Sequence, residues 1–206
     1  MSSLPPRIYL ASKSSRRREL LRQIGVSFEM LLSREGSNRD VDINEEPLTG
    51  EDPLVYVRRV AEMKATLGWH RLDQRRLPRN IVLAADTTIS LDGGIIGKPA
   101  SKGHAAEILG MLSGKTHQVL TAVTLRFETR IDTRVSVSEV TFRQLTEAEI
   151  RHYISTGEPM DKAGAYAIQG RGAIFITRLA GSYSGVMGLP LAETAQLLRD
   201  FGHPVF

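Results

Sequence analysis

The sequence predicts an α/β fold built on a mixed β-sheet flanked by helices. Segments typical of strands and of helices alternate through the first half of the chain, a pattern that indicates parallel strands joined by helices. In the second half, residues 116–127 and 135–142 alternate apolar and polar side chains, and we expect these two strands to pair antiparallel. With 206 residues and 41% hydrophobic content, the chain can bury one substantial core, so we expect one domain over residues 1–206.

At the amino-terminal end the sequence predicts a strand, a turn and a helix. The apolar stretch 7–11 is of strand length, and leucines at helical spacing follow it. Gly25 is expected to end this helix. Residues 33–53 are polar and contain glycines and prolines, which predicts a long loop of the kind that is usually functional or mobile.

A second helix is expected to start at Pro53, because proline suits the first helical turn, and to end near Gly68. Its buried face is predicted to contain Leu54, Val57, Ala61 and Ala65. A basic connector at 75–79 then leads to the apolar run 81–85. That run predicts a central strand covered on both faces and ending at Asp86.

Turn and capping signals predict the remaining elements. Asp-Gly and Gly-Gly within residues 91–95 predict a β-hairpin. A Thr-x-x-Glu capping box at Thr146 and Glu149 predicts the start of a helix that Gly157 ends. The other predicted elements are a helix at 102–112, a strand at 173–179 and a helix at 191–201.

Composition narrows the classes of function. The chain has no cysteine, which excludes disulfide frameworks, thiol nucleophiles and cysteine metal sites. No run reaches the roughly 18 apolar residues of a membrane span and no signal peptide is recognised, so we expect a cytoplasmic protein without a membrane partner. The sequence contains 21 arginines and 6 lysines at a net charge of +4. This arginine excess indicates an anionic partner, either nucleic acid or a small phosphate ester.

The start of the first helix is a candidate anion site. Arg16, Arg17 and Arg18 follow Ser14 in its first turn, where the helix dipole disfavours a cation by about 0.3 to 1 kcal/mol. A bound phosphate would reverse this, because helix N–H groups, serine hydroxyls and guanidinium groups would converge on it. The alternative is an ordinary solvated basic helix end. Arg18 is the arginine that we expect to stay on the surface.

Asp86 and Lys64 are candidates for the chemistry. An aspartate at the end of a central strand emerges at the sheet edge where open α/β sheets bind ligands. There it suits a general base or a metal ligand, and the alternative is an aspartate that begins a turn. Lys64 lies seven residues after Val57 and falls on the apolar stripe of its helix. It therefore either snorkels to solvent or points into a cleft toward phosphate.

The remaining polar candidates are less specific. The glycines before Lys98 superficially resemble a phosphate-binding loop, but the spacing is one residue short and Pro99 stands where Ser or Thr would hold magnesium. That motif is rejected. His117 shares one face of its strand with apolar residues, which favours a packed histidine over a catalytic one. Glu45 and Glu46 could reach a metal, or could form a solvated acidic loop.

Several longer motifs occur together in a fixed order. They are LASKSSRRRELL at 10–21, AADTTI at 84–89, GKP at 97–99, SGKTHQVLTAV at 113–123, EPMDKAGAYAIQGRG at 158–172 and GSYSGVMGLPL at 181–191. On these motifs the chain resembles, over almost its whole length, the Maf family of nucleoside triphosphate pyrophosphatases. The resemblance implies a Maf/ITPase-like mixed sheet flanked by helices with a cleft between two lobes, and it implies a homodimer.

The resemblance also implies a reaction. Family members cleave nucleoside triphosphates between the α and β phosphates, giving a monophosphate and pyrophosphate, with a divalent metal. Mg²⁺ or Mn²⁺ is expected, because these metals prefer oxygen ligands. Asp86 matches the family's proton acceptor, and Glu45 matches its acidic loop residue, a metal ligand. Because the chain has no cysteine, we expect Asp86 and Glu45 to be the oxygen ligands of the metal. The positions that match phosphate-facing residues of the family are Ser12, Arg16, Arg17, Lys64 and Lys98.

Substrate choice is implied at Thr87 and Gln169, which together with Arg16 match the branch acting on dTTP and UTP. The implied role is cleaning of the nucleotide pool, with modified pyrimidine triphosphates as further substrates. The alternative within the family is 7-methyl-GTP. A non-catalytic module that binds nucleic acid or division proteins is a further alternative, and the aromatic content of 6% disfavours nucleic-acid binding.

Two positions and one segment depart from the family pattern. Ser15 replaces the usual proline, but serine can cap the helix instead. Ala167 stands where glycine is commoner, and a positive φ there would strain it and disturb the nearby Gln169. Residues 33–44 are longer than usual, which weakens the match at Glu45.

Overall fold

A computed structural model describes residues 7–32 and 44–206 of the chain. Seven strands form one mixed sheet in the order β2-β1-β3-β5-β6-β7, and β4 pairs with β3 off this path. β1 is parallel to β2 and β3, and the other pairs are antiparallel. The strands are β1 Ile8–Leu10, β2 Phe28–Met30, β3 Val82–Leu91, β4 Gly94–Ile96, β5 Thr116–Phe127, β6 Arg130–Phe142 and β7 Ile176–Ala180.

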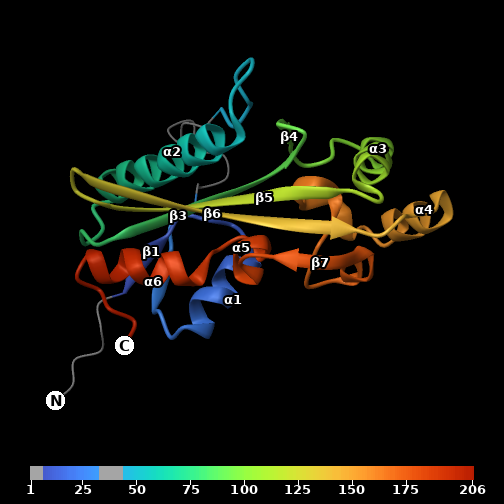
Figure 1. The fold of residues 1–206 in the computed structure, drawn as a ribbon. Coiled ribbons are helices and arrows are strands. Elements are labelled where there is room, and N and C mark those ends of the chain that lie inside the picture. The colour runs from blue at the N-terminus through green and yellow to red at the C-terminus, as the bar shows by residue number, and fades with distance from the viewer. Residues whose placement is uncertain (1–6, 33–43) are drawn as a thin grey trace.

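Helices cover both faces of this sheet. α2 lies on one face, and α1, α5 and α6 lie on the other, while α3 and α4 sit together beyond one end of the long strands (Figure 1). The helices are α1 Ser15–Gln23, α2 Pro53–Gln74, α3 Lys102–Leu112, α4 Glu147–Ser155, α5 Tyr183–Met187 and α6 Leu191–Asp200. Short 3-10 helices are η1 Glu158–Asp161, η2 Ala163–Ala165 and η3 Arg171–Phe175. The predicted α/β fold with a mixed sheet is confirmed.

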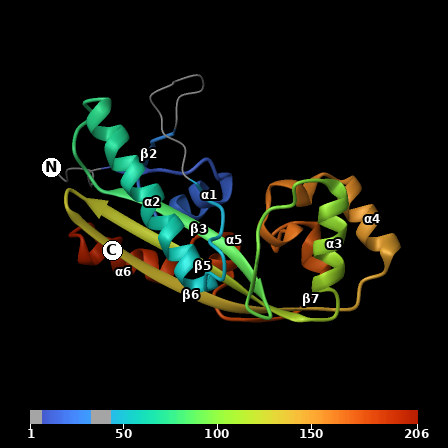
Figure 2. The same cartoon turned by 90° about the horizontal axis from the view of Figure 1, so that it is seen from above.

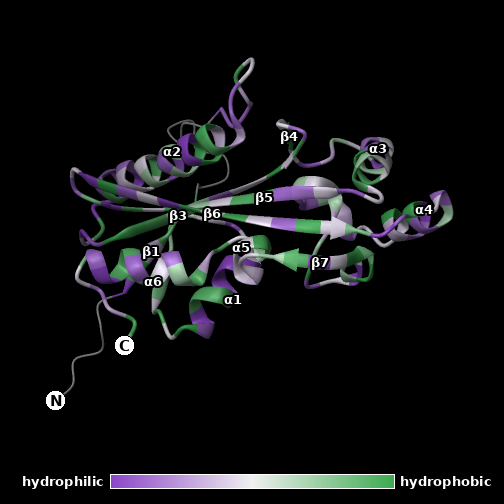
Figure 3. Ribbon diagram, in the orientation of Figure 1, coloured by the Kyte–Doolittle hydropathy of each residue, from purple (hydrophilic) through white to green (hydrophobic). Residues whose placement is uncertain are grey.

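The buried residues form two lobes that share the long strands. In the first lobe, α2 packs on one face of the sheet and α1 with α6 on the other. In the second lobe, α3 and α4 pack around the far ends of β3, β5 and β6. Figure 2 shows the lobes side by side, with these strands running from one to the other. In Figure 3, β3 is mostly hydrophobic whereas α2 alternates hydrophobic and hydrophilic residues, as expected for a helix with one face on a sheet.

Several predicted elements are confirmed. The helix predicted at 102–112 and the strand predicted at 116–127 have these bounds in α3 and β5. β6 pairs antiparallel with β5, although it begins earlier than the predicted residue 135. Thr146 and Glu149 form the predicted capping box, and Gly157 follows α4 with φ of 77°.

The predicted end of the second helix is wrong. α2 continues through Gly68 to Gln74, because Gly68 serves close packing there rather than termination. A Cβ at Gly68 would lie 2.8 Å from Val82 Cγ1 and 3.0 Å from Ala11 Cβ. The prediction that Leu54 is buried is also wrong, because Leu54 is exposed at the start of the helix. The other three predicted core residues of α2 are fully buried.

The predicted end of the central strand is also wrong. β3 runs through Asp86 to Leu91, because β5 pairs with it along the stretch from Val82 to Ser90. Asp86 therefore lies inside a strand rather than at its end. The hairpin predicted after it is present, with positive φ at Asp92 and Gly93 between β3 and β4.

Near the carboxyl terminus the prediction is partly wrong. Residues 171–175, assigned in part to a strand, form η3, and β7 starts only at Ile176. Sequence patterns also did not predict β2 and α5, which are too short to show a periodicity. Most of the predicted loop, residues 33–43, lies outside the described residues. Among the described residues, no helix is long and apolar enough to span a membrane.

Candidate active site

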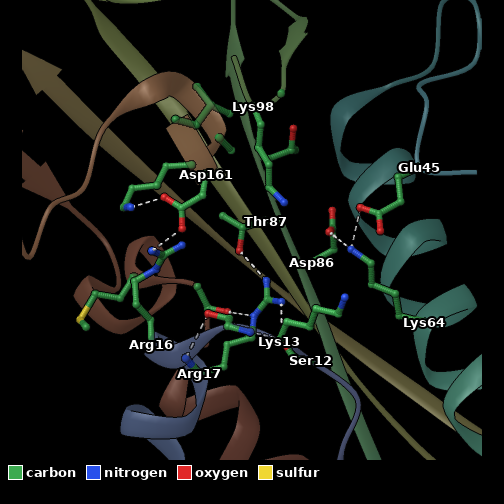
Figure 4. A pocket seen from close by; sticks show the side chains of 18 of the residues that line it. Ser12, Lys13, Arg16, Arg17, Glu45, Lys64, Asp86, Thr87, Lys98 and Asp161 are labelled. Carbon is green, nitrogen blue, oxygen red and sulfur yellow. Dashed lines mark hydrogen bonds and ion pairs between the residues drawn. The ribbon is translucent and has the colours of Figure 1, made fainter. Parts of the chain in front are cut away.

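A cleft of about 1300 Å³ lies between the two lobes. Binding pockets for small molecules are usually about 300 to 1,000 Å³, so this cleft has room for a nucleotide. The predicted site residues all line it: Ser12, Arg16, Arg17, Glu45, Lys64, Asp86, Thr87, Lys98 and Gln169. Figure 4 shows most of them facing this common space. The fold thus brings together residues from both lobes that are far apart in the sequence.

The cleft opens along one edge of β3. β1 pairs with β3 only at Val82 and Leu83, and β4 pairs with it from Ile89 onward. Asp86 and Thr87 lie between these two pairings. Because consecutive residues of a strand point to opposite faces, Asp86 faces α2 and Thr87 faces α1 and α5. Both side chains reach the same cleft because it wraps around this edge.

Asp86, Lys64 and Glu45 form one charged cluster on the α2 side. Lys64 Nζ lies 2.7 Å from Asp86 Oδ1 and 2.9 Å from Glu45 Oε2. Lys64 therefore points into the cleft and does not snorkel to solvent. Asp86 is 7% exposed, so its carboxylate is desolvated by the protein and compensated by the ammonium group. The alternative of a turn aspartate is wrong, because Asp86 is in β3.

Tyr56, which sequence reasoning missed, holds the acidic segment in place. Its hydroxyl donates to the carbonyl oxygen of Glu45 at 2.9 Å. Burial, reinforced by the carboxylates of Asp86 and Glu45, raises the pKa of Tyr56 to about 12. The hydroxyl therefore keeps its proton at neutral pH and remains a donor. Glu46, the neighbouring candidate, also lines the cleft.

The start of α1 forms the opposite wall. Ser14 caps the helix by accepting from the backbone N–H of Arg17 at 3.4 Å, so the replacement of proline by Ser15 leaves an ordinary helix start. Ser12 Oγ accepts from Arg17 Nη1 at 3.2 Å. Arg18 is half-buried rather than on the surface as expected. The guanidinium groups of Arg16 and Arg17 line the cleft.

Arg17 is held by the protein through three of its nitrogens. Besides Ser12, its Nε donates to the carbonyl oxygen of Gly188 at 2.8 Å and its Nη2 to Thr87 Oγ1 at 3.3 Å. A guanidinium carries five N–H donors, so two remain for a ligand. Burial lowers the pKa of Arg17, and the Asp86 carboxylate opposes this shift.

Thr121, also missed from the sequence, donates from its Oγ1 to the carbonyl oxygen of Gly185 and contacts Thr87.

The second lobe supplies Lys98, Gln169 and two residues that sequence reasoning did not select, Asp161 and Lys162. Arg16 Nη1 lies 3.9 Å from Asp161 Oδ2, which joins the two lobes across the cleft. Lys162 Nζ also contacts the Asp161 carboxylate. Asp161 and Lys162 could have been selected from the sequence, because both belong to the motif EPMDKAGAYAIQGRG.

Ala167 does not have the positive φ that would have strained it. Positive φ falls on Gly164 and Ala165 instead, at 71° and 57°. Ala167 therefore carries no such strain next to Gln169.

His117 is a packed residue as predicted: it is 2% exposed, its Nε2 lies 2.8 Å from the Tyr166 hydroxyl, and burial lowers its pKa to about 4.

The donor set fits a hard divalent cation. The carboxylate oxygens of Asp86 and Glu45 both contact the Lys64 ammonium group, so they lie on either side of one position in the cleft. Within the described residues no group of three or more His, Asp or Glu side chains is placed to hold a metal. Magnesium usually takes one or two carboxylates together with water and substrate phosphates, so two carboxylates suit it when a triphosphate is bound.

Comparison with known proteins decides the family. The model of the family described as Maf-like protein matches residues 7–201. The chain belongs to the Maf family. The match covers both lobes, so the family assignment includes all parts of the cleft described above.

Maf relatives of this chain are similar over their full length. A protein of Aromatoleum aromaticum named dTTP/UTP pyrophosphatase is 58% identical over 206 residues, with both chains covered completely. One of Nitrosomonas europaea with the same name is 55% identical, covering 97% of this chain and 96% of the relative. The solved structure of the Staphylococcus aureus Ham1 protein matches with a TM-score of 0.41 at 16% identity, covering 69% of this chain and 73% of that one.

Proposed function

We propose that this Maf protein hydrolyses nucleoside triphosphates, with dTTP and UTP as substrates, to the monophosphate and pyrophosphate. The observation that carries the proposal is one cleft in which cationic side chains from both lobes face the carboxylates of Asp86 and Glu45. Full-length relatives are named for this activity. An enzyme with this specificity would remove selected nucleotides from the cellular pool.

Cationic groups in the cleft would bind the triphosphate. Arg16 and Arg17 approach from the first turn of α1, and Lys98 from the loop after β4. The guanidinium groups offer paired N–H donors, which suit phosphate oxygens. Charge that develops on the leaving pyrophosphate is then stabilised by cations that are already in place.

Asp86 would act as the general base. A water oxygen attacks the α phosphorus, the bond from this phosphorus to the oxygen bridging it to the β phosphorus breaks, and that oxygen leaves with the bonding electrons on pyrophosphate. Asp86 accepts the proton that the water loses. Lys64 orients the carboxylate before the reaction through its contact of 2.7 Å.

A divalent cation, Mg²⁺ or Mn²⁺, is part of the proposal, and Asp86 and Glu45 would hold it. Such a cation supplies charge neutralisation at the phosphates and makes bound water more acidic. Lys64 Nζ contacts both of these carboxylates and would lie beside the cation.

Base choice would depend on Thr87, Gln169 and Arg16, all of which line the cleft. The names of the relatives favour thymine and uracil nucleotides and do not favour 7-methyl-GTP or a non-catalytic binding module. We further propose that residues 1–206 act as one domain, because β3 and β5 contribute to the cores of both lobes. A homodimer stays a prediction from the family resemblance, and a cytoplasmic location stays a prediction from the sequence.

A substrate panel tests the proposal. Purified protein is incubated with Mg²⁺ and, separately, dTTP, UTP, CTP, GTP, ATP and 7-methyl-GTP, and the products are identified by ion-exchange chromatography. We expect dTTP and UTP to be consumed fastest, with monophosphate and pyrophosphate as products. Diphosphate with orthophosphate would show that a different bond is cleaved, and preference for 7-methyl-GTP would contradict the substrate assignment.

A further inference from the structure

Gln169 lies in a turn whose position is set from outside the cleft. It is between η2 and η3, where the chain has little regular structure to fix it. Two residues behind this turn, Glu158 and Tyr153, hold the backbone on both sides of Gln169. Neither residue lines the cleft, so any effect on a ligand is transmitted through the residues that they hold.

Glu158 binds the carboxyl-terminal side of the turn. Its Oε2 accepts from the backbone N–H of Arg171 at 3.1 Å and its Oε1 from that of Gly172 at 3.2 Å. These N–H groups open η3, whose preceding residue Gly170 has no side chain to cap it. Free N–H groups at a helix start bind anions. The Glu158 carboxylate therefore caps η3, although Glu158 lies outside this helix.

Tyr153 of α4 connects the carboxylate to the amino-terminal side of the turn. Its hydroxyl donates to Glu158 Oε1 at 2.7 Å and accepts from the backbone N–H of Ala167 at 3.2 Å. Burial, together with the bond to Glu158, raises the pKa of Tyr153, so the hydroxyl keeps the proton that this arrangement needs. The ring packs edge-on against Phe175 with centroids 5.0 Å apart, which fixes the hydroxyl.

The two glycines after Gln169 fit closely against this pair. A Cβ at Gly170 would lie 2.5 Å from both carboxylate oxygens of Glu158. A Cβ at Gly172 would lie 2.8 Å from the Tyr153 hydroxyl and 3.0 Å from the carbonyl oxygen of Ala167. The Gln-Gly-Arg-Gly sequence thus lets the turn close onto Glu158 and Tyr153 with little freedom to shift.

We infer that Tyr153 and Glu158 are positioning residues that set the location of Gln169 and thereby the selectivity of the enzyme among nucleobases. The inference rests on the proposed function, because it requires that Gln169 face the base. Their side-chain hydrogen bonds go to each other and to the backbone of Ala167, Arg171 and Gly172, on the base side of the cleft. The backbone carbonyl oxygen of Glu158 also accepts from Lys162 Nζ. The phosphate side is built on α1, β3 and the loop that carries Lys98.

Tyr153→Phe tests this inference with the smallest change, because the ring and its packing stay and only the hydroxyl is removed. We expect KM for dTTP and UTP to rise about tenfold, because a displaced Gln169 would lose about one well-placed hydrogen bond to the base. The value of kcat should change less than about twofold. KM for CTP and GTP should stay unchanged, so selectivity falls. Tripolyphosphate, which has no base, should inhibit the variant and the wild type equally.

Matched controls separate positioning from folding. Tyr9→Phe removes another buried tyrosine hydroxyl, which donates to the carbonyl oxygen of Pro78 at 3.0 Å away from the cleft, and selectivity should stay at the wild-type value. Glu158→Gln, with Glu147→Gln as its surface control on α4, provides a second variant if Tyr153→Phe does not fold. Thermal unfolding confirms that each protein is native.

The outcomes are distinguishable. An equal loss on all nucleotides, accompanied by weaker tripolyphosphate inhibition, would show a merely structural role and overturn the inference. Wild-type protein that hydrolyses no triphosphate would overturn the proposed function instead. In that case calorimetric binding of a non-hydrolysable dTTP analogue is compared with tripolyphosphate. Weaker binding of the analogue alone in Tyr153→Phe supports the inference, and equal binding to wild type and variant overturns it.

Discussion

At the residue scale, charged side chains in the cleft satisfy one another before a ligand arrives. Arg17 donates to Ser12, Thr87 and Gly188, and Lys64 bridges Asp86 and Glu45. A buried charge without a partner would cost several kcal/mol. These internal contacts let the fold hold a concentrated set of charges, and each cation can exchange or extend its contacts when phosphate enters.

Asp86→Asn should lower kcat by about 10² to 10⁴, because general-base catalysis contributes this much and asparagine cannot accept the proton. Nucleotide binding should remain measurable by calorimetry, since the cationic residues are unchanged and a negative charge near the phosphates is removed. Asp92→Asn is the matched control. Asp92 is exposed in the β3–β4 turn with φ of 52°, which asparagine tolerates, and this variant should keep wild-type rates. A near-wild-type rate for Asp86→Asn would contradict the role of Asp86.

At the scale of elements, α2 is placed by a glycine against the strand that carries Asp86. Gly68 lets the helix backbone approach Val82 of β3 and Ala11 after β1. The same helix presents Lys64 to Asp86 one turn earlier. Close packing at Gly68 therefore fixes how deeply Lys64 reaches into the cleft.

Gly68→Ala should be less stable than the wild type, because the new Cβ would lie 2.8 Å from Val82 Cγ1 and force a shift that costs about 1 to 3 kcal/mol of unfolding free energy. This exceeds the gain of about 0.5 to 1 kcal/mol that alanine brings over glycine in a helix. Gly110→Ala in α3 is the control, since its Cβ would meet nothing within 4 Å. It should raise stability by about that gain. Urea unfolding of both variants checks the prediction, and a stabilised Gly68→Ala would refute the packing argument.

At the scale of the whole molecule, the cleft exists because the two lobes share one sheet. β3, β5 and β6 run through both lobes, while α1 with α2 lies at one end and α3 with α4 at the other. The Arg16–Asp161 contact is a weak link across the opening, at 3.9 Å and partly exposed. The continuous strands therefore connect the two lobes on either side of the cleft.

Global stability should decrease as pH falls from 6.5 toward 4, partly through His117. The unfolded chain binds a proton at this histidine near pH 6.5, but burial lowers its folded pKa to about 4, so acid favours unfolding in this interval. The difference corresponds to a loss of about 3 kcal/mol. His203, whose pKa is also lowered by burial, acts in the same direction.

Urea unfolding between pH 6.5 and 4.5 measures this effect before most carboxylates titrate. His117→Gln should show a flatter dependence of unfolding free energy on pH than the wild type, whatever its absolute stability. His70→Gln, at an exposed histidine, is the surface control. Glu51 and Glu149, with pKa values of about 2, add their loss of stability only at lower pH, as they become protonated. An unchanged slope in His117→Gln would show that another group is responsible.

The sequence by itself determined many local elements and selected residues that line one cleft. Capping and turn residues act on their neighbours, so α4 with its capping box at Thr146 and the β3–β4 hairpin could be predicted. Apart from Glu45 and Lys64, the selected site residues lie in specific motifs, and all of them line the cleft. Helix ends at glycine and strand ends at aspartate were predicted wrongly at Gly68 and Asp86, because local rules do not include the strands that pack against these positions.

Only the tertiary structure decided how the site residues are arranged. That Lys64 points inward, that Arg17 is anchored to Gly188, and that Tyr153 and Glu158 hold the turn of Gln169 all depend on contacts between distant segments. Such contacts result from the packing of whole elements on the sheet, and spacing along the chain does not encode them. Arginine excess indicated an anionic ligand, and the fold placed the arginines opposite the carboxylate that would act on it.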